Sequence, residues 1–192
     1  MARGFSEQEK ENIRKKLIEA CKQCWTKYGY KKTNVDELCK YAGISKGAFY
    51  LFYKTKESLF CEVLCFVQNQ ICENATRVME TKKGKEGVRE VLKQIYREYD
   101  ENNFLYNSEG TDFVVLLNKL SEEEVKKIEK SNQQCRQIFL EKSHLKFKVS
   151  EEIGMSVIYS LIMNIKNKDF LPYNHIETFD FMVDCLIDKL YE

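Results

Sequence analysis

The scarcity of helix-breaking residues limits what this chain can fold into more than any other feature. Its 192 residues include one proline and eight glycines. Together these nine residues fall well under the roughly 12% share that proline and glycine take on average. Sandwiches and barrels need many tight turns, whereas proline breaks a helix and glycine weakens it. The sequence therefore predicts an all-α fold.

Composition and charge narrow the functional classes. Hydrophobic residues make up 43% of the chain and charged residues 32%, which is typical of soluble globular proteins. Apolar runs such as Phe113 to Leu117 are no longer than six residues, far too short to cross a bilayer. We therefore expect a cytoplasmic protein with no membrane partner. Residues 1–60 carry 13 basic and 7 acidic residues, whereas residues 61–192 carry 18 and 23. This asymmetry predicts an N-terminal unit that meets a polyanion.

The N-terminal segment contains a helix-turn-helix pattern. A short apolar helix follows the sequence Thr33-Asn34-Val35-Asp36, which resembles a capping box with Asp in place of Glu. Ala42-Gly43-Ile44-Ser45 then interrupts it, with Gly43 supplying a turn and Ser45 a cap for the next short helix. Two short helices joined by a glycine-containing turn are typical of helix-turn-helix units.

Side chains suited to DNA lie on the second short helix and just after it. Lys46, Tyr50, Lys54 and Lys56 offer donors to phosphates, and no acidic residue lies between Lys40 and Lys56. Gly47 and Ala48 are small enough for the backbone to approach the floor of the major groove. Ala48 or Leu51 could also contact a thymine methyl group.

Residues 13–60 resemble the N-terminal domain of TetR-family transcriptional regulators, through the pattern I-x4-I-x-A-x4-W-x3-G-Y-x2-T-x-V-x-E-L-x3-A-G-I-S-K-G-A-F-Y-x2-Y-x2-K-E-S-L-F. The resemblance implies a three-helix DNA-binding domain at residues 1–54. A larger helical ligand-binding and dimerisation domain would follow at residues 55–192. The candidate DNA-binding residues are Thr33, Ser45, Lys46, Gly47, Ala48, Tyr50, Leu51, Lys54 and Lys56.

Within that set, the resemblance implies phosphate contacts for Thr33, Tyr50 and Lys56. Lys46, Gly47, Ala48 and Leu51 match positions that face the groove. Leu51 and Phe52 are apolar where many members carry His, Trp or Tyr, so hydrogen bonding to bases is not expected there.

Two helices near the C-terminus, at residues 150–167 and 176–191, are apolar on more than one face. A helix of this kind must be buried on two sides. We expect these helices to pair with those of a second copy in a four-helix bundle, as the last two helices of TetR-like proteins commonly do. Gly154, Ser156 and Ser160 would permit close approach. The alternative is a large monomeric core.

The middle of the chain is rich in aromatic residues, and the resemblance implies that its helices enclose a small-molecule pocket. Acidic residues nearby (Glu98, Glu101, Glu109, Asp112) would suit a cationic or hydroxylated aromatic ligand. The alternative is that the aromatics form the core and the acids are solvated. The candidate pocket residues are Phe66, Tyr96, Tyr99, Phe104, Tyr106, Phe113, Tyr159 and Met163.

The eight cysteines are expected to be reduced thiols, because most fall at helical core spacing. Cys21 and Cys24 form a lone C-x-x-C with no second pair and no nearby histidine, so we expect no metal site. No cofactor motif and no nucleophile with a recognisable base is present, so an enzyme is disfavoured.

These observations predict a ligand-responsive repressor that a small molecule releases from a palindromic double-stranded operator. The alternative is a DNA-binding regulator controlled by cysteine oxidation or by a protein partner.

Overall fold

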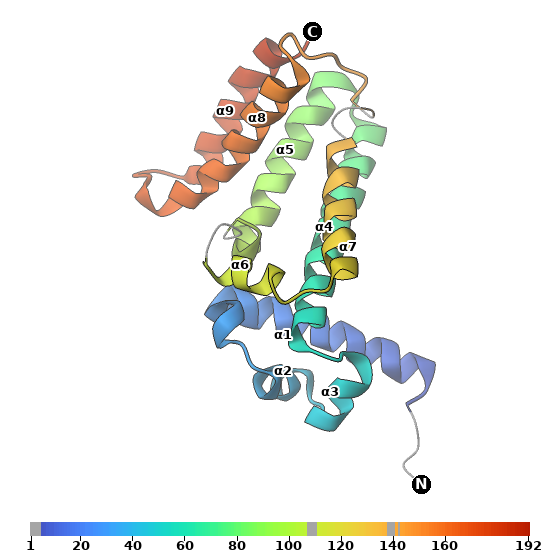
Figure 1. Ribbon diagram of the computed structural model, residues 1–192. Helices are drawn as coiled ribbons and strands as arrows, with labels where there is room; N and C mark the ends of the chain where they lie inside the picture. The colour runs from blue at the N-terminus through green and yellow to red at the C-terminus, as the bar shows by residue number, and fades with distance from the viewer. Residues whose placement is uncertain (1–4, 107–110, 138–140, 142) are drawn as a thin grey trace. The chain divides into compact units, whose positions relative to one another are not determined.

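Helices form nearly all of the part of the chain that the structure describes, residues 5–106, 111–137, 141 and 143–192 of a computed structural model (Figure 1). The all-α prediction is confirmed. None of the described helices is long and apolar enough to span a membrane. In chain order the elements are α1 (Glu7–Lys32), α2 (Val35–Ala42), α3 (Lys46–Phe52), α4 (Lys56–Thr81), α5 (Gly84–Glu101), η1 (Asn103–Leu105), α6 (Thr111–Leu117), α7 (Glu122–Gln137), α8 (Glu151–Met163), η4 (Asn164–Phe170) and α9 (His175–Leu190).

Contacts divide the chain into two compact units. The first contains residues 1–66 and 108–128, and therefore α1 to α3, the start of α4, α6 and the start of α7. The second contains residues 67–107 and 129–192, and therefore the rest of α4 and α7 together with α5, α8 and α9. A boundary at residue 54, as expected from the sequence, falls inside the first of these units.

Aromatic rings on α1 and α4 build the core of the first unit. The Trp25 and Phe60 ring centroids lie 4.5 Å apart, and Tyr30 meets Phe60 edge-on at 5.2 Å. Phe49 of α3 is fully buried. Arg14 of α1 binds Glu62 of α4 with two hydrogen bonds, from Nε at 2.6 Å and from Nη2 at 2.9 Å. Burial and this paired contact together fix α3 and the start of α4 on α1.

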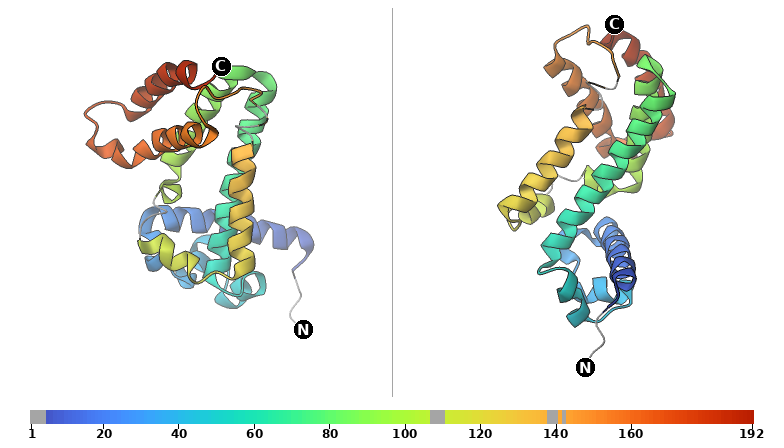
Figure 2. Two further views of the ribbon diagram at one scale, coloured as in Figure 1. Left: turned by 45° about the horizontal axis from the view of Figure 1, so that its top comes forward. Right: turned by 90° about the vertical axis from the view of Figure 1, so that its right-hand side faces the viewer.

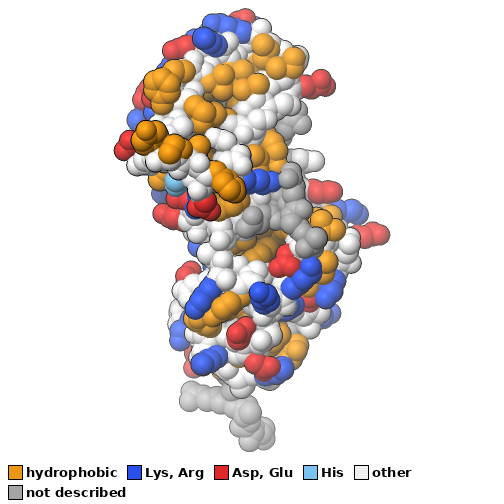
Figure 3. Space-filling model, turned by 90° about the vertical axis from the view of Figure 1, so that its left-hand side faces the viewer, with side chains coloured by type: hydrophobic (Ala, Val, Ile, Leu, Met, Phe, Trp, Pro, Cys, Tyr) orange, Lys and Arg blue, Asp and Glu red, His pale blue; other side chains and the backbone are white. Residues whose placement is uncertain are grey.

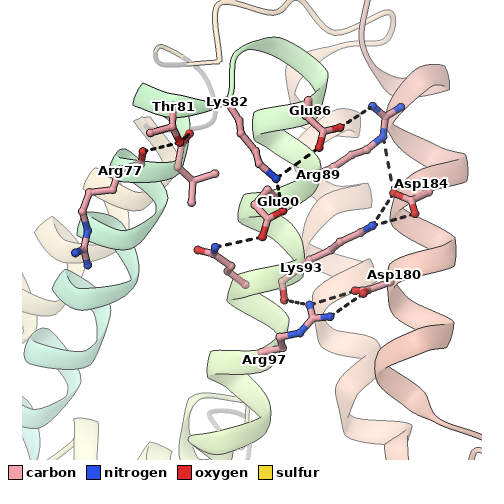
Figure 4. Close-up of polar contacts among 12 residues, drawn as sticks. Arg77, Thr81, Lys82, Glu86, Arg89, Glu90, Lys93, Arg97, Asp180 and Asp184 are labelled. Carbon is pink, nitrogen blue, oxygen red and sulfur yellow. Dashed lines mark hydrogen bonds and ion pairs between the residues drawn. The ribbon is translucent and has the colours of Figure 1, made fainter.

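In the second unit, α5 packs against both α8 and α9. The rings of Tyr96 on α5 and Phe179 on α9 stack with centroids 3.8 Å apart. A ladder of ion pairs also joins α5 to α9, and Figure 4 draws its Lys93–Asp184 and Arg97–Asp180 rungs. Its three rungs pair a cation of α5 with an acid of α9, namely Arg89 with Asp188 at 2.7 Å, Lys93 with Asp184 at 2.8 Å and Arg97 with Asp180 at 2.7 Å.

Gly154 has a role within the second unit that the sequence did not reveal. A Cβ atom at this position would lie 2.5 Å from the Phe147 ring, which itself stacks on Tyr191 with centroids 4.4 Å apart. Two backbone hydrogen bonds between residues 146–148 and the end of the chain hold that ring in place. The expectation that Gly154 makes room for a second copy is therefore wrong, because its missing side chain accommodates Phe147.

Candidate nucleic-acid interface and effector cavity

Capping residues set where α2 and α3 begin and where α2 ends. The Asn34 side chain accepts a hydrogen bond from the Glu37 N–H at 2.9 Å, so Asn34 caps α2, and the predicted capping box at Thr33 is wrong. Gly43 ends α2 with φ +69°, in the left-handed region that glycine adopts without strain. The Ser45 hydroxyl accepts from the Ala48 N–H at 3.1 Å and caps α3. The helix-turn-helix backbone is therefore set by Asn34 at the start of α2 and by Gly43 and Ser45 in the predicted turn.

One face of α3 is open to solvent. Leu51 is 75% exposed and Tyr50 is 50% exposed, although both are large side chains. The nearest atom to a Cβ added at Gly47 would be the Ser45 hydroxyl oxygen at 3.9 Å. Nothing within the protein therefore requires glycine at position 47, and the open space lies on the outer face. Of the predicted DNA-binding residues, the structure exposes Ser45, Lys46, Gly47, Tyr50, Leu51 and Lys54 and leaves Ala48 half-buried.

Lys46, one of the predicted DNA contacts, is paired with an acidic residue of α2. The Lys46 ammonium donates to Asp36 Oδ2 on α2 at 3.0 Å, and both side chains remain more than half exposed. The hydrogen bond and charge of Asp36 raise the pKa of Lys46. An exposed pair of this kind contributes little stability, so Lys46 can exchange Asp36 for a phosphate at small cost.

Thr33 and Lys56 point into the first unit. Thr33 is fully buried, and its hydroxyl donates to the Gly29 carbonyl at 2.8 Å. The Lys56 ammonium donates to the carbonyls of Tyr30 at 3.0 Å and Thr33 at 2.8 Å, and it lies 4.3 Å from the centroid of the Tyr30 ring. Desolvation lowers the pKa of Lys56. Both residues therefore cap the end of α1, and in this conformation neither presents its polar group to DNA.

A cavity of about 190 Å³ lies within the second unit, among residues of α4, α5, η1, α7 and α8. Tyr99 and Tyr159 supply phenol groups to its wall, and burial raises the pKa of Tyr99, with a further contribution from Tyr159. Gln68 donates to Asn132 Oδ1 at 2.6 Å, which joins α4 to α7 at the wall. The described lining residues, none of which is charged, are Gln68, Ile71, Ile95, Tyr99, Leu105, Asn132, Met155, Ile158, Tyr159 and Ile162.

The structure brings only Tyr99 and Tyr159 of the predicted pocket residues to this cavity. Tyr96, Phe104 and Tyr106 are buried in the core, and Tyr96 is stacked on Phe179. Phe66 is exposed and Phe113 lies in the first unit. Met163 is half-buried outside the described lining. Of the acidic residues proposed to select a cation, Glu98, Glu101 and Asp112 do not line the cavity and Glu109 lies outside the described residues.

The cysteines differ sharply in their surroundings. Cys21 and Cys24 are both buried, and burial raises the pKa of each thiol, which disfavours oxidation at the C-x-x-C sequence. Cys72 is disulfide-bonded, so the expectation of reduced thiols throughout is wrong for this residue. Six cysteines of the described part of the chain are free: Cys21, Cys24, Cys39, Cys61, Cys65 and Cys185.

An apolar surface lies over α8 and α9. Figure 3 faces the side on which these two helices lie and shows hydrophobic side chains gathered over them, and Figure 2 shows the helices running beside each other. Ile153 is 55% exposed and Phe181 is 70% exposed. A shallow groove on this surface is lined by Glu152, Ile153, Ser156, Val157, Ser160, Leu161, Asn164, Met182 and Leu186.

Parts of the chain match known proteins. Residues 17–63 match the family model described as bacterial regulatory proteins, tetR family. The uncharacterized HTH-type transcriptional regulator YhgD of Bacillus subtilis is 41% identical over 68 residues, 35% of this chain and 36% of that protein. The HTH-type transcriptional regulator QacR of Staphylococcus aureus is 40% identical over 53 residues, 28% of each chain. The matches span about a third or less of these relatives.

Solved structures resemble the whole chain. A TetR family transcription regulator from Marinobacter aquaeolei superposes with a TM-score of 0.71 at 17% identity, over 97% of this chain and 100% of that one. The transcriptional regulator FadR of Bacillus subtilis, solved in complex with stearoyl-CoA, has a TM-score of 0.64 at 15% identity, over 94% and 98% of the two chains. At these identities the likeness establishes the fold alone.

Proposed function

We propose that this chain, whose residues 17–63 match the tetR family of bacterial regulatory proteins, is a DNA-binding transcription regulator that a small molecule releases from a palindromic operator. The observation that carries the proposal is the exposed outer face of α3, where Tyr50 and Leu51 stand open to solvent beside Lys46 and Lys54. A recognition helix must present such a face to the major groove.

The exposed residues divide into two roles. Lys46, Tyr50 and Lys54 offer donors to phosphates, which position the protein on the duplex. Leu51 offers an apolar contact to a thymine methyl group, and Gly47 leaves room for the backbone to approach the base edges. Lys56 and Thr33 support this face indirectly, because their hydrogen bonds fix the end of α1 immediately before the cap of α2.

The apolar surface over α8 and α9 supports a homodimer. Exposed apolar patches rimmed by polar residues mark sites of protein association. A two-fold pairing of this surface would use the same residues of both copies. Two recognition helices could then enter successive major grooves of a palindromic site, with half-sites one helical turn or roughly 34–36 Å apart.

The cavity of the second unit supports a neutral, largely apolar effector. Its described lining offers phenol and amide groups but no charge, and a charged ligand would lose its hydration there without a partner. A volume of about 190 Å³ lies below the roughly 300–1,000 Å³ of pockets that hold drug-sized ligands. We therefore expect a compact aromatic or aliphatic molecule with one or two hydrogen-bonding groups, and not an acyl-CoA.

Operator binding should lose phosphate contacts when Lys54 is replaced. We expect Lys54→Ala to weaken binding to a duplex from the region upstream of this protein's own gene. The slope of log affinity against log salt should fall by about one unit for each protomer, because each phosphate contact releases roughly one counterion. Fluorescence anisotropy at a series of salt concentrations measures both quantities.

Lys189→Ala, an exposed lysine on α9, is the matched control and should leave affinity and slope unchanged. A scrambled duplex of equal length tests selectivity. Equal binding of the two duplexes would contradict the assignment of α3 as the recognition helix. An unchanged slope in Lys54→Ala would show that Lys54 makes no phosphate contact.

The effector assignment predicts a charge preference. In a panel of compact aromatic compounds matched in size, neutral members should release the operator, and cationic or anionic members should not. Ile162→Trp should retain operator binding and lose this response, because the larger side chain occupies the cavity. Anisotropy of the protein–DNA complex during titration reports release, and release by charged compounds alone would exclude this cavity as the effector site.

A further inference from the structure

Two thiols that play no part in the proposed function lie together on α4. Cys61 and Cys65 are four residues apart, so they occupy one face of the helix in successive turns. Cys61 is only 3% exposed, whereas Cys65 is half-buried and reaches the surface. Both belong to the first unit, where this face of α4 meets the start of α7. One thiol therefore reaches the surface, and the other is buried one helical turn earlier on the same face of α4.

Hydrogen bonds and charge make this pair reactive. The Cys61 thiol lies 3.6 Å from the Glu124 carbonyl oxygen of α7 and also forms a hydrogen bond with Cys65. That bond lowers the pKa of Cys65 to about 7, burial opposes the change, and the charge of Lys127 reinforces it. The hydrogen bond raises the pKa of Cys61. Near neutral pH, Cys65 is therefore partly a thiolate, whereas Cys61 keeps its proton and donates it to the Glu124 carbonyl oxygen.

The number of sulfur ligands limits what this pair can hold. No group of three or more His, Cys, Asp or Glu side chains suited to a metal ion occurs among the described residues. This pair therefore lacks the three or four ligands that a structural zinc ion requires. Two thiolates can bind a soft atom that has two exchangeable ligands, because thiolates prefer soft partners.

We propose that Cys61 and Cys65 form a dithiol site for monosubstituted trivalent arsenicals, in which both sulfurs bind one arsenic atom. The Cys65 thiolate attacks arsenic first, and the Cys61 sulfur closes the ring from the adjacent turn. For phenylarsine oxide, two As–S bonds replace the As=O bond. The two thiol protons leave with the oxygen as one molecule of water. No electrons are transferred, so no oxidant is needed.

The other free cysteines do not offer the same arrangement. Cys21 and Cys24 are both buried, so neither presents an accessible first nucleophile. Cys185 is exposed on α9 and is available as a single-thiol comparison. A single thiol yields an adduct that other monothiols displace, whereas a pair gains from the high effective concentration of its second sulfur.

The test is retention of phenylarsine oxide by the full-length protein in excess glutathione, read by intact-protein mass spectrometry. The wild type should keep one phenylarsenic group in place of two hydrogens. Cys65→Ser and Cys61→Ala should each weaken retention about a hundredfold or more, since each removes the intramolecular second bond. Cys185→Ser should behave as the wild type. Circular dichroism confirms that each variant is folded.

Three outcomes would overturn the proposal. The wild type fails to retain the adduct, or the double variant of Cys61 and Cys65 retains it. Alternatively, Cys61→Ala retains it as well as the wild type does, which would make Cys65 a simple nucleophile. Loss in both single variants with retention in Cys185→Ser supports the dithiol site.

Discussion

Ile153→Glu is expected to convert the protein to monomers and to lower operator affinity about a hundredfold or more. Ile153 is 55% exposed in a single copy and lines the groove between α8 and α9. A glutamate there costs the protomer little, because the site is open to solvent. In the proposed dimer the same change buries a charge from each copy within an apolar interface.

The loss of affinity follows from the loss of the second half-site. Binding of the second recognition helix in a dimer is intramolecular, and such linkage strengthens binding by factors of roughly 10²–10⁴. The molar mass measured by light scattering at micromolar concentration should therefore fall from twice the 22.8 kDa chain mass to a single chain mass. Anisotropy on the same samples should show the weaker binding.

Val114→Glu is the matched control for this change. Val114 is a 48% exposed apolar residue on α6 of the first unit, outside the surface over α8 and α9. The Val114→Glu protein should remain dimeric. An Ile153→Glu protein that stays dimeric would place the dimer interface elsewhere, and one that is monomeric with full operator affinity would contradict the two-half-site geometry.

Gly29→Ala should lower the free energy of unfolding by about 3 kcal/mol. Gly29 has φ +79° and ψ 168° at a kink inside α1, a region that almost only glycine occupies and that costs other residues roughly 1–3 kcal/mol. The added Cβ would also lie 2.7 Å from Asp112 Oδ2. That carboxylate accepts a hydrogen bond from the Lys31 N–H at 3.3 Å, so moving it breaks a contact between α6 and α1.

Gly43→Ala separates the cost of backbone strain from the cost of a steric clash. Gly43 also has a positive φ, +69°, but no atom lies within 4 Å of the added Cβ. We expect a loss of about 1 kcal/mol there. Thermal unfolding at a fixed protein concentration should show a midpoint lowered by roughly 2–4 °C per kcal/mol. Equal losses in the two variants would show that the contact with Asp112 does not matter.

Sequence reasoning located the helices and the recognition face because local signals determine them. The lack of breakers predicts helices, and Gly43 and Ser45 mark the turn through their own backbone geometry. Lys56 shows the limit of this reasoning. An ammonium that could bind phosphate is equally suited to the carbonyls at the end of α1, and only the three-dimensional fold shows that it does so.

The cavity was harder to predict for a similar reason. Tyr96 and Tyr99 are three residues apart on α5, yet one stacks in the core and the other lines the cavity. Aromatic composition does not distinguish these environments. Gln68 and Asn132 approach each other across 64 positions of sequence, and no local pattern reports such a pairing. The two amide groups of the cavity wall were therefore found only from the structure, whereas the phenols of Tyr99 and Tyr159 were predicted from the sequence.

The ion-pair ladder favours the antiparallel orientation of α5 and α9 but specifies their axial register only weakly. Its cations recur every four residues at 89, 93 and 97, and its acids recur every four at 188, 184 and 180. A slide of one helix by a turn, about 5.4 Å, would re-form two pairs in one direction and three in the other, where Lys85, already 4.0 Å from Asp188, would take the place of Arg89. The stack of Tyr96 on Phe179 does not repeat in this way. Two registers one turn apart therefore form nearly the same ion pairs, and the stacking of the two rings selects between them.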